Sequence, residues 1–230
     1  MPDITITCPD GEFSAYLATP SGGSAGGVLV IQEIFGVNKD MRDHCDHLAQ
    51  QGFVALCPDI FWRQEPGIQL TDQSEEEWAR AFELYQGFDV AKGVEDLKAS
   101  LAHLRGVDGC NGKAGTVGFC LGGLLVYLMA AASDADCNVA YYGVGIDEQL
   151  DKAGSITTPT ILHIAEEDGF VSKEAQAKIK DGLKGHAHVE VHSYPGVDHA
   201  FARNGGVNFD QAAAALANDR TLACFKATLA

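Results

Sequence analysis

The chain has 230 residues, of which 46% are hydrophobic and 21% are charged, and its formal net charge is -16. A surface this negative repels phosphate backbones and anionic lipids, which excludes nucleic acid and membranes as expected partners. The length and the composition are typical of one globular domain, so we expect residues 1–230 to form a single domain.

The first residues of the chain and the cysteines indicate the cellular compartment that we expect for the protein. Residues 1–4 carry neither the basic segment nor the apolar core of a secretion signal, and no apolar run reaches the ~20 residues that span a bilayer. The seven cysteines are an odd number without a Cys-x-x-Cys pair, as expected of reduced thiols. We therefore expect a cytoplasmic protein that binds no metal and no other cofactor.

Strand patterns come first along the chain. Residues 4–8 and 12–19 are expected to pair as a hairpin at the edge of a larger sheet, and residues 28–31 and 53–57 are apolar runs typical of buried strands. Asn38 is placed to cap a helix that ends near residue 51. The remaining segments, 20–27 and 62–73, are expected to be loops.

The second half of the chain alternates helices and strands. Ser74 and Glu77 predict a capping box at the start of a helix that breaks near Gly87. Further helices are expected over 90–104, 124–132, from Ser172 to about residue 183, and over 208–228, with strands over 115–119, 139–142, 160–164 and 188–194. This order predicts an α/β fold with a mostly parallel central sheet and helices on both faces.

The junction between the strand 115–119 and the helix after it has the sequence Gly118-Phe-Cys120-Leu-Gly122. Gly-x-Cys-x-Gly is the pattern of a nucleophile elbow, a sharp turn that exposes the central side chain and needs small residues on both sides. The N-terminal amides of the next helix would favour the thiolate of Cys120. A buried cysteine beside a glycine-rich turn is the alternative interpretation.

Three reactive side chains follow predicted strands. Cys120, Asp168 and His199 each stand just beyond the carboxyl end of a strand, where sites form in parallel sheets. Their order along the chain, nucleophile then acid then base, is that of the α/β-hydrolase fold. In such a triad the histidine takes the thiol proton, the aspartate orients the histidine, and the cysteine attacks a carbonyl carbon to form a thioester.

Two alternatives remain open for these positions. Glu166 or Glu167 could be the acid, with Asp168 only part of a turn. Three histidines could share one face of a strand and bind a metal, namely His186, His188 and His192. No cysteine-rich or carboxylate-rich partner is close to them in sequence, so a polar strand face is the simpler interpretation.

Several motifs together resemble the dienelactone hydrolase family. They are Gln32-Glu-Ile-Phe-Gly-Val-Asn38, Cys57-Pro58-Asp59, Gly118-Phe-Cys-Leu-Gly-Gly123, Tyr141-Tyr142-Gly143 and His199-Ala-Phe-Ala-Arg203, and the resemblance extends from about residue 3 to about residue 225. It implies an α/β-hydrolase fold without a large lid domain and a triad of Cys120, His199 and Asp168. It also implies a small lactone substrate that carries a carboxylate, opened to maleylacetate during the breakdown of catechols.

The resemblance implies roles for three further residues. Glu33 matches a buried glutamate that keeps the elbow thiol neutral until substrate binding frees its carboxylate to take the thiol proton. A structural carboxylate that receives backbone N–H groups is the alternative for Glu33. The backbone N–H groups of Leu121 and Ile34 would form the oxyanion hole.

The substrate-binding residues depart from the family pattern in one place. Family members that act on dienelactone hold its carboxylate with two arginines, and Arg203 matches one of them. The other position falls at Trp78, and Arg80 is turned away from it by about 200° around a helix. Phe82 and Tyr85 are placed to line the same pocket, although their spacing is also typical of a core.

The sequence therefore predicts a hydrolase that opens a small lactone or an activated ester, most simply a dienelactone, as a monomer or weak oligomer. Glutamine amidotransferases share the Gly-x-Cys-x-Gly pattern, but their histidine precedes the acid, whereas Asp168 precedes His199 here. The other alternative is a non-enzymatic thiol sensor or ligand-binding module on a hydrolase-like fold. A sensor needs no proton shuttle, so the presence of both Asp168 and His199 argues against it.

Overall fold

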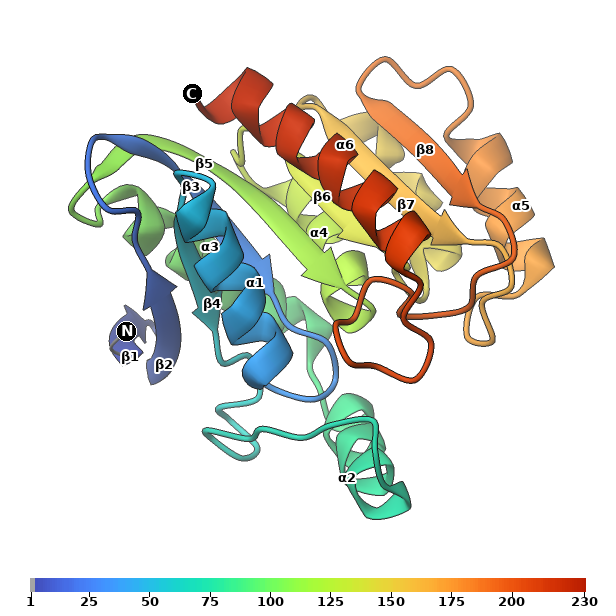
Figure 1. Ribbon diagram of the computed structural model, residues 1–230, viewed down its shortest axis with the longest axis horizontal. Helices are drawn as coiled ribbons and strands as arrows, with labels where there is room; N and C mark the ends of the chain where they lie inside the picture. Colours follow the sequence, from blue (N-terminus) through green and yellow to red (C-terminus); the bar gives the residue numbers. More distant parts are fainter. Residues whose placement is uncertain (1–2) are drawn as a thin grey trace. The chain divides into compact units, whose positions relative to one another are not determined.

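The computed structural model describes residues 3–230 (Figure 1). By their internal contacts these residues divide into two units, one reaching residue 115 and including residues 229–230, and the other comprising residues 116–228. No helix in the described part of the chain is long and apolar enough to cross a lipid bilayer. The single domain expected for residues 1–230 stays a prediction.

The first unit contains the predicted hairpin. β1 (Asp3–Cys8) pairs antiparallel with β2 (Gly11–Ala18), and β2 pairs antiparallel with β4 (Val54–Pro58). β4 also pairs in parallel with β3 (Ala25–Ile31). Every residue of β3 and β4 is buried, as expected for strands whose sequences are continuous apolar runs.

β3 begins at Ala25, inside the segment for which a loop was predicted, so that prediction is wrong for residues 25–27. Two glycines explain the difference. A Cβ atom on Gly26 would lie 2.5 Å from Cβ of Leu229, and one on Gly27 would lie 2.8 Å from Cγ of Leu104. These glycines allow close packing within a strand, and a glycine-rich composition alone does not distinguish that role from a loop.

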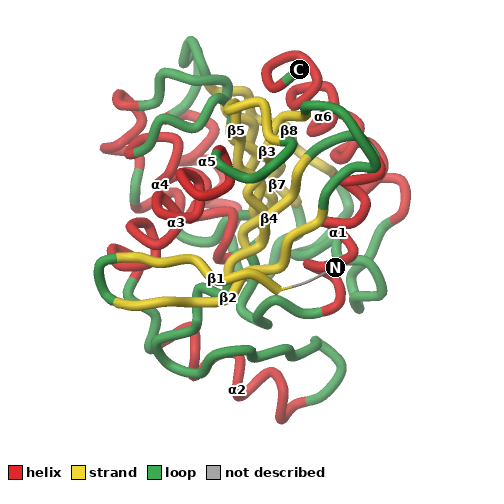
Figure 2. Tube along the Cα trace, turned by 90° about the vertical axis from the view of Figure 1, so that its left-hand side faces the viewer, coloured by secondary structure: helices red, strands yellow, loops and turns green. Residues whose placement is uncertain are grey.

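Three helices belong to this unit: α1 (Lys39–Gln50), α2 (Glu75–Gln86) and α3 (Val90–Arg105). Figure 2 shows α1 and α3 on opposite faces of β3 and β4. Asn38 caps α1 as predicted, because its side chain accepts a hydrogen bond from the N–H of Met41 at 3.2 Å.

The predicted capping box at the start of α2 is only half formed. The hydroxyl of Ser74 accepts from the N–H of Glu77 at 3.2 Å, as expected. The carboxylate of Glu77, however, accepts from the N–H of Thr71 at 3.0 Å. The loop before the helix folds back toward it. The N–H of Thr71 therefore donates to Glu77, whereas in a complete capping box the N–H of Ser74 would do so.

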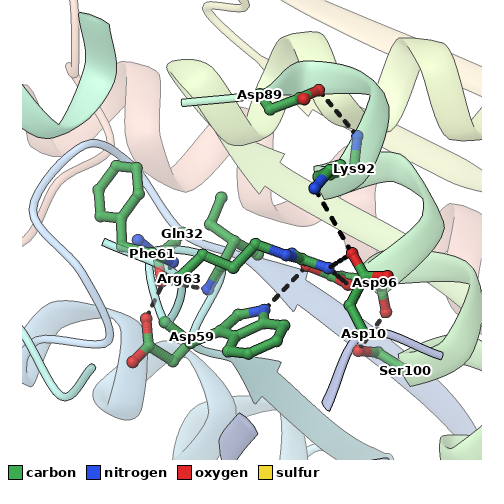
Figure 3. A network of polar contacts seen from close by, with 11 residues as sticks. Asp10, Gln32, Asp59, Phe61, Arg63, Asp89, Lys92, Asp96 and Ser100 are labelled. Carbon is green, nitrogen blue, oxygen red and sulfur yellow. Dashed lines mark hydrogen bonds and ion pairs between the residues drawn. The ribbon is translucent and has the colours of Figure 1, made fainter. Parts of the chain in front are cut away.

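Residues 59–73, between β4 and α2, are held by a polar network centred on α3. Asp96 of α3 is 1% exposed and accepts a hydrogen bond from Trp62 at 2.9 Å and one from Arg63 at 3.0 Å. Arg63 also donates to Asp10, in the turn of the β1–β2 hairpin, at 3.0 Å (Figure 3). One guanidinium therefore ties this irregular segment to both a helix and a hairpin.

The second unit has the parallel strands expected of the fold. β5 (Cys110–Phe119), which enters this unit at Thr116, pairs with β6 (Asn138–Tyr141), β6 with β7 (Thr160–Ala165), and β7 with β8 (Val189–Tyr194). α4 (Leu121–Ala132) and α5 (Lys173–Gly182) lie on one face of these strands, and α6 (Gln211–Leu229) lies on the other (Figure 2). The predicted α/β class, with mostly parallel strands between helices, is confirmed.

Some of the observed element boundaries differ from those predicted. β5 begins five residues before the predicted 115, at Cys110. α6 begins at Gln211 and not at 208, because Asp210 accepts a hydrogen bond from the N–H of Ala213 at 2.8 Å and so acts as the cap. Two short 3-10 segments, η1 (Ile146–Glu148) and η2 (Leu150–Ser155), were not predicted.

Candidate active site

Cys120 stands at a sharp turn between β5 and α4. Its backbone angles, φ 55° and ψ -114°, lie where residues other than glycine are rarely found, so the turn is strained. The N–H of Cys120 donates to the carbonyl of Tyr141 at 3.1 Å, and its own carbonyl accepts from Gly123 at 3.0 Å and from Leu124 at 3.2 Å. These hydrogen bonds hold a partly exposed thiol at the first turn of a helix.

The glycines around the turn leave no room for side chains. A Cβ atom on Gly118 would overlap the carbonyl oxygen of Gly122 and lie 3.0 Å from a methyl group of Val126. Gly123, which the sequence analysis named only as the end of a family motif, is equally restricted, because a Cβ atom there would lie 2.5 Å from the carbonyl oxygen of Tyr141. The third glycine in the run is thus needed for packing of α4 against β6.

His199 and Asp168 meet at the ends of β8 and β7. Nδ1 of His199 lies 2.9 Å from Oδ2 and 3.1 Å from Oδ1 of Asp168, and both residues are buried. Oδ1 of Asp168 also accepts from the N–H groups of Phe170 at 2.8 Å and Val171 at 3.1 Å. Hydrogen bonds of this kind stabilise an ionised carboxylate, and that carboxylate in turn orients the imidazole.

The two alternative acids lie elsewhere. Glu167 forms an ion pair with Lys173 at 2.8 Å, and Glu166 lies 3.8 Å from Lys180. Both lysines are solvent-accessible, so these pairs belong to the surface near α5. Of the three candidates only Asp168 has a carboxylate that is hydrogen-bonded to the imidazole of His199.

Cys120 and His199 interact electrostatically. Burial favours the neutral imidazole, but attraction to the thiolate form of Cys120 and the hydrogen bond to Asp168 outweigh it and raise the pKa of His199 to about 10. Nε2 of His199 is buried and has no hydrogen bond of ordinary geometry to any of the residues 3–230. With Nδ1 directed at Asp168, Nε2 is the nitrogen that remains to exchange a proton with the sulfur or with a ligand.

Aromatic rings enclose the imidazole of His199. The ring of Tyr142 lies 5.0 Å from it at an interplanar angle of 62°, and the ring of Phe170 lies 4.9 Å from it at 68°. Such edge-to-face contacts restrict rotation of the imidazole while it stays on Asp168. Neither ring was predicted to be part of the site, although Tyr142 directly follows β6 and so stands at the edge where site residues were sought.

The histidines considered for a metal site do not share a strand face. His186 and His188 precede β8, and the ring of His186 is hydrogen-bonded to the carbonyl of Ala153 at 3.0 Å. His192 pairs instead with Glu190 at 3.1 Å. Within residues 3–230 there is no group of three or more His, Cys, Asp or Glu side chains that could hold a metal ion.

Two further predicted site residues lie in the second unit. Leu121 is the first residue of α4, directly after Cys120, and is buried. Arg203 follows His199 by four residues, is 6% exposed, and donates its backbone N–H to Ala200 at 3.0 Å. Gly206 makes room for the arginine, because a Cβ atom there would lie 2.9 Å from Cδ of Arg203.

The remaining predicted residues lie in the first unit. Glu33 and Ile34 lie two and three residues beyond the end of β3 and are buried. Phe35, next in the chain, contacts the ring of Trp78 edge-on at 5.0 Å, and Trp78 stacks on Phe82 at 5.5 Å. Trp78 and Phe82 therefore form one aromatic cluster with the segment that follows β3.

The aromatic and charged side chains of α2 differ in their exposure and contacts. Phe82 and Tyr85 are each 37% exposed, a high value for large apolar side chains. Arg80 donates to Glu65 at 3.1 Å and to Glu83 at 2.7 Å, so its guanidinium is engaged by two carboxylates. That Arg80 does not replace the arginine missing at Trp78 stays a prediction.

Comparisons with known proteins identify the family to which this chain belongs. The Dienelactone hydrolase family matches residues 13–229. A protein of Azospirillum brasilense, provisionally named carboxymethylenebutenolidase, is 53% identical over 230 residues, which cover 98% of each chain. Carboxymethylenebutenolidase 1 of Cupriavidus pinatubonensis is 40% identical over 212 residues and covers 92% of this chain and 90% of its own.

A further relative and a solved structure extend the comparison. The carboxymethylenebutenolidase of Pseudomonas putida is 40% identical over 220 residues, covering 95% of this chain and 93% of its own. A crystal structure from Klebsiella pneumoniae, provisionally named dienelactone hydrolase, superimposes with a TM-score of 0.88 at 26% identity, covering 98% of this chain and 97% of that one. The chain belongs to the dienelactone hydrolase family and is a hydrolase that acts on carboxylic esters.

Proposed function

We propose that this hydrolase opens a small lactone or activated ester through a covalent thioester on Cys120, with His199 as proton carrier and Asp168 as its orienting partner. The observation that carries the proposal is the combination at His199, where one ring nitrogen contacts Asp168 at 2.9 Å and the pKa is raised by Cys120. A protonated histidine beside the sulfur at neutral pH favours the thiolate, which is the nucleophilic form of cysteine.

The proposed reaction has two stages. The sulfur of Cys120 attacks the lactone carbonyl carbon, and the N–H of Leu121 at the start of α4 stabilises the oxyanion. The ring C–O bond then breaks, and the leaving oxygen takes a proton from His199. In the second stage His199 removes a proton from water, the resulting hydroxide attacks the thioester, and the free carboxylic acid leaves Cys120.

The relatives' names point to one substrate within this class. Those from Cupriavidus pinatubonensis and Pseudomonas putida are named carboxymethylenebutenolidases, so we propose a dienelactone as the substrate and maleylacetate as the product. Such a substrate carries a carboxylate, and Arg203, buried four residues after His199, is the proposed contact for it. Trp78, Phe82 and Tyr85 are proposed to contact its apolar part.

Two roles taken from the family resemblance stay predictions. Glu33 is proposed to hold the thiol of Cys120 neutral before substrate binds, so the thiolate beside protonated His199 is the form that we propose once substrate is bound. The N–H of Ile34 is proposed as the second oxyanion donor. A Glu33→Gln variant tests the first role through the rate at which Cys120 is oxidised without substrate. We expect this rate to rise, because the carboxylate that keeps the thiol neutral is lost.

The experiment that tests the nucleophile compares dienelactone hydrolysis by the wild type, Cys120→Ala and Cys224→Ala. Cys224 is a matched control because it is also a partly exposed cysteine of the second unit, placed on α6. We expect Cys120→Ala to lose turnover and Cys224→Ala to retain it. Wild-type rates in Cys120→Ala would overturn the assignment, and loss of only one lactone per protein molecule would favour a binding module.

A further inference from the structure

Beyond the ends of β7 and β8, the two following loops stay paired. The last pair of the ladder is Ala165 with Tyr194. The N–H of Glu166 donates to the carbonyl of Tyr194 at 3.0 Å, and that of Glu167 donates to the carbonyl of Val197 at 2.9 Å. The ladder of backbone hydrogen bonds thus continues up to the residue before Asp168.

A side chain makes the next link in this series. Oδ1 of Asp198 accepts a hydrogen bond from the N–H of Gly169 at 2.9 Å and another from the N–H of His199 at 2.6 Å. One carboxylate oxygen therefore joins the residue that follows Asp168 to the backbone of His199. Hydrogen bonds from N–H groups to an ionised carboxylate are shorter and stronger than those to a neutral acceptor.

The backbone of His199 is then held on both sides. Its N–H donates to Asp198, and its carbonyl accepts from the side-chain amide of Asn208 at 3.0 Å. The next residue, Ala200, has φ 64°, a strained value for alanine that persists only where the surroundings impose it. The placement of the imidazole therefore depends on these loop contacts as well as on its contact with Asp168.

We infer that Asp198 is a positioning residue, whose carboxylate holds the loops of Asp168 and His199 in register so that Nδ1 of His199 meets the acid. The inference rests on the proposed roles of Cys120, His199 and Asp168. Asp198 is exposed and its Oδ1 accepts hydrogen bonds from two backbone N–H groups, so it acts through the triad and does not touch the reacting atoms.

The test measures dienelactone hydrolysis by Asp198→Ala and Asp198→Asn. The alanine variant loses the acceptor, whereas the asparagine variant keeps an oxygen at the same position. We expect Asp198→Ala to lower kcat by about 10- to 100-fold, because displacement of the base by a fraction of an ångström affects the chemical step. We expect KM to change little, and Asp198→Asn to recover most of the activity.

A second measurement separates positioning from stability. The pKa of His199, followed by NMR titration, should fall in Asp198→Ala, because the hydrogen bond to Asp168 is one of the interactions that raise it. Glu174→Gln is the matched control, since it removes an exposed carboxylate from the first turn of α5 without removing an acceptor for a backbone N–H of these loops. It should leave both kcat and the pKa of His199 unchanged.

The results distinguish this inference from the proposed function. If Cys120→Ala is inactive while Asp198→Ala keeps the wild-type kcat and His199 pKa, the positioning role is wrong and the nucleophile assignment stands. If Cys120→Ala is fully active, the proposed function itself is wrong. Should Asp198→Ala unfold, Asp198→Ser repeats the test, because its hydroxyl is too short to reach the N–H of Gly169.

Discussion

The carbonyl oxygen of Tyr141, at the end of β6, accepts a hydrogen bond from the N–H of Cys120 at 3.1 Å. The phenol of the same tyrosine donates to Asn218 at 2.9 Å and is hydrogen-bonded to Thr221 at 2.6 Å, and both partners lie on α6. Tyr141 therefore connects the strained turn of the proposed nucleophile with the helix on the opposite face of the strands.

Removing the hydroxyl in Tyr141→Phe should lower the free energy of unfolding by about 1–2 kcal/mol, because two hydrogen bonds are lost and one of the two partners, Thr221, stays buried. Tyr127→Phe is a matched control. The hydroxyl of Tyr127 is also buried, but it has no hydrogen-bond partner among the residues that the structure describes, so its removal should cost nothing. Urea unfolding measures both, and equal losses in the two variants would contradict the role given to Tyr141.

The turn at Cys120 should not tolerate a side chain at Gly118. In Gly118→Ala the new methyl group would collide with the carbonyl of Gly122, so we expect a loss of stability of about 1–3 kcal/mol. Esterase activity should fall as well, because the collision displaces the turn. Gly154→Ala serves as the control in the same unit, since a Cβ atom there has no neighbour within 4 Å. Normal activity and stability of Gly118→Ala would show that the turn is more adaptable than we infer.

The elevated pKa of His199 should depend on the sulfur. Cys120→Ser replaces a group that can be negatively charged by a neutral hydroxyl, so the pKa of His199 should fall from about 10, because the lowering effect of burial is then opposed by fewer interactions. In the wild type the charged imidazolium stabilises the fold below the ordinary histidine pKa, and this contribution is lost as pH rises toward about 10. NMR titration of the imidazole measures the shift. An unchanged pKa in Cys120→Ser, with Cys224→Ser as control, would mean that Asp168 alone raises it.

Acid should destabilise the protein partly through His163. This buried imidazole is hydrogen-bonded to Tyr194 at 2.8 Å and Thr221 at 3.2 Å, and burial together with His192 and Arg220 holds its pKa well below the ordinary value. The unfolded chain therefore binds the extra proton first. Stability contributed by neutral His163 is complete above the ordinary pKa and is lost as pH falls below it, at up to about 1.4 kcal/mol per pH unit.

The variant His163→Asn isolates this contribution. Its free energy of unfolding should be lower than that of the wild type at pH 7, but it should decline less steeply between pH 7 and pH 5. Comparing the two slopes cancels the titration of other groups, including His44, whose pKa burial lowers to about 4. Parallel slopes in the two proteins would show that His163 does not take up a proton on unfolding.

The proposed carboxylate contact can be tested with paired substrates. In Arg203→Ala, hydrolysis of carboxylated lactones should fall by roughly 30-fold or more, as expected when one partner of a buried charge pair is removed. Uncharged lactones of similar size should lose much less activity. Arg203→Lys keeps the charge but not the planar fork, and it should recover only part of the rate. An equal drop for both substrate types would assign Arg203 a structural role.

Short-range patterns were enough to locate the elbow and the strand ends. The Gly-x-Cys-x-Gly sequence requires small residues because the chain passes close to itself within five residues, a contact that Gly118 and Gly122 make in the structure. Asn38 and Ser172 could be recognised as caps for the same reason, since each bonds an N–H group three residues later. Interactions between residues this close in the chain can be predicted from the local sequence.

Interactions between distant segments were predicted less well. The sequence left Asp168, Glu166 and Glu167 as possible acids, because all three follow the same strand and differ only in which one faces a loop 31 residues later. The role of Gly26 and Gly27 was missed because their partners, Leu229 and Leu104, are remote in the chain. Asp198 had no signal of its own, since an aspartate next to a histidine is common in loops.

The amino-acid order by itself thus determined the class of fold, the position of the cysteine that we propose as nucleophile, and the edge of the sheet at which its partners had to be sought. Periodicity, glycine spacing and the direction of parallel strands can each be inferred from contiguous stretches of sequence. Only the folded chain decided which carboxylate orients His199, which rings enclose it and which side chain links the two loops. Those contacts join residues from segments that follow different strands, and these segments come together only after the strands have paired.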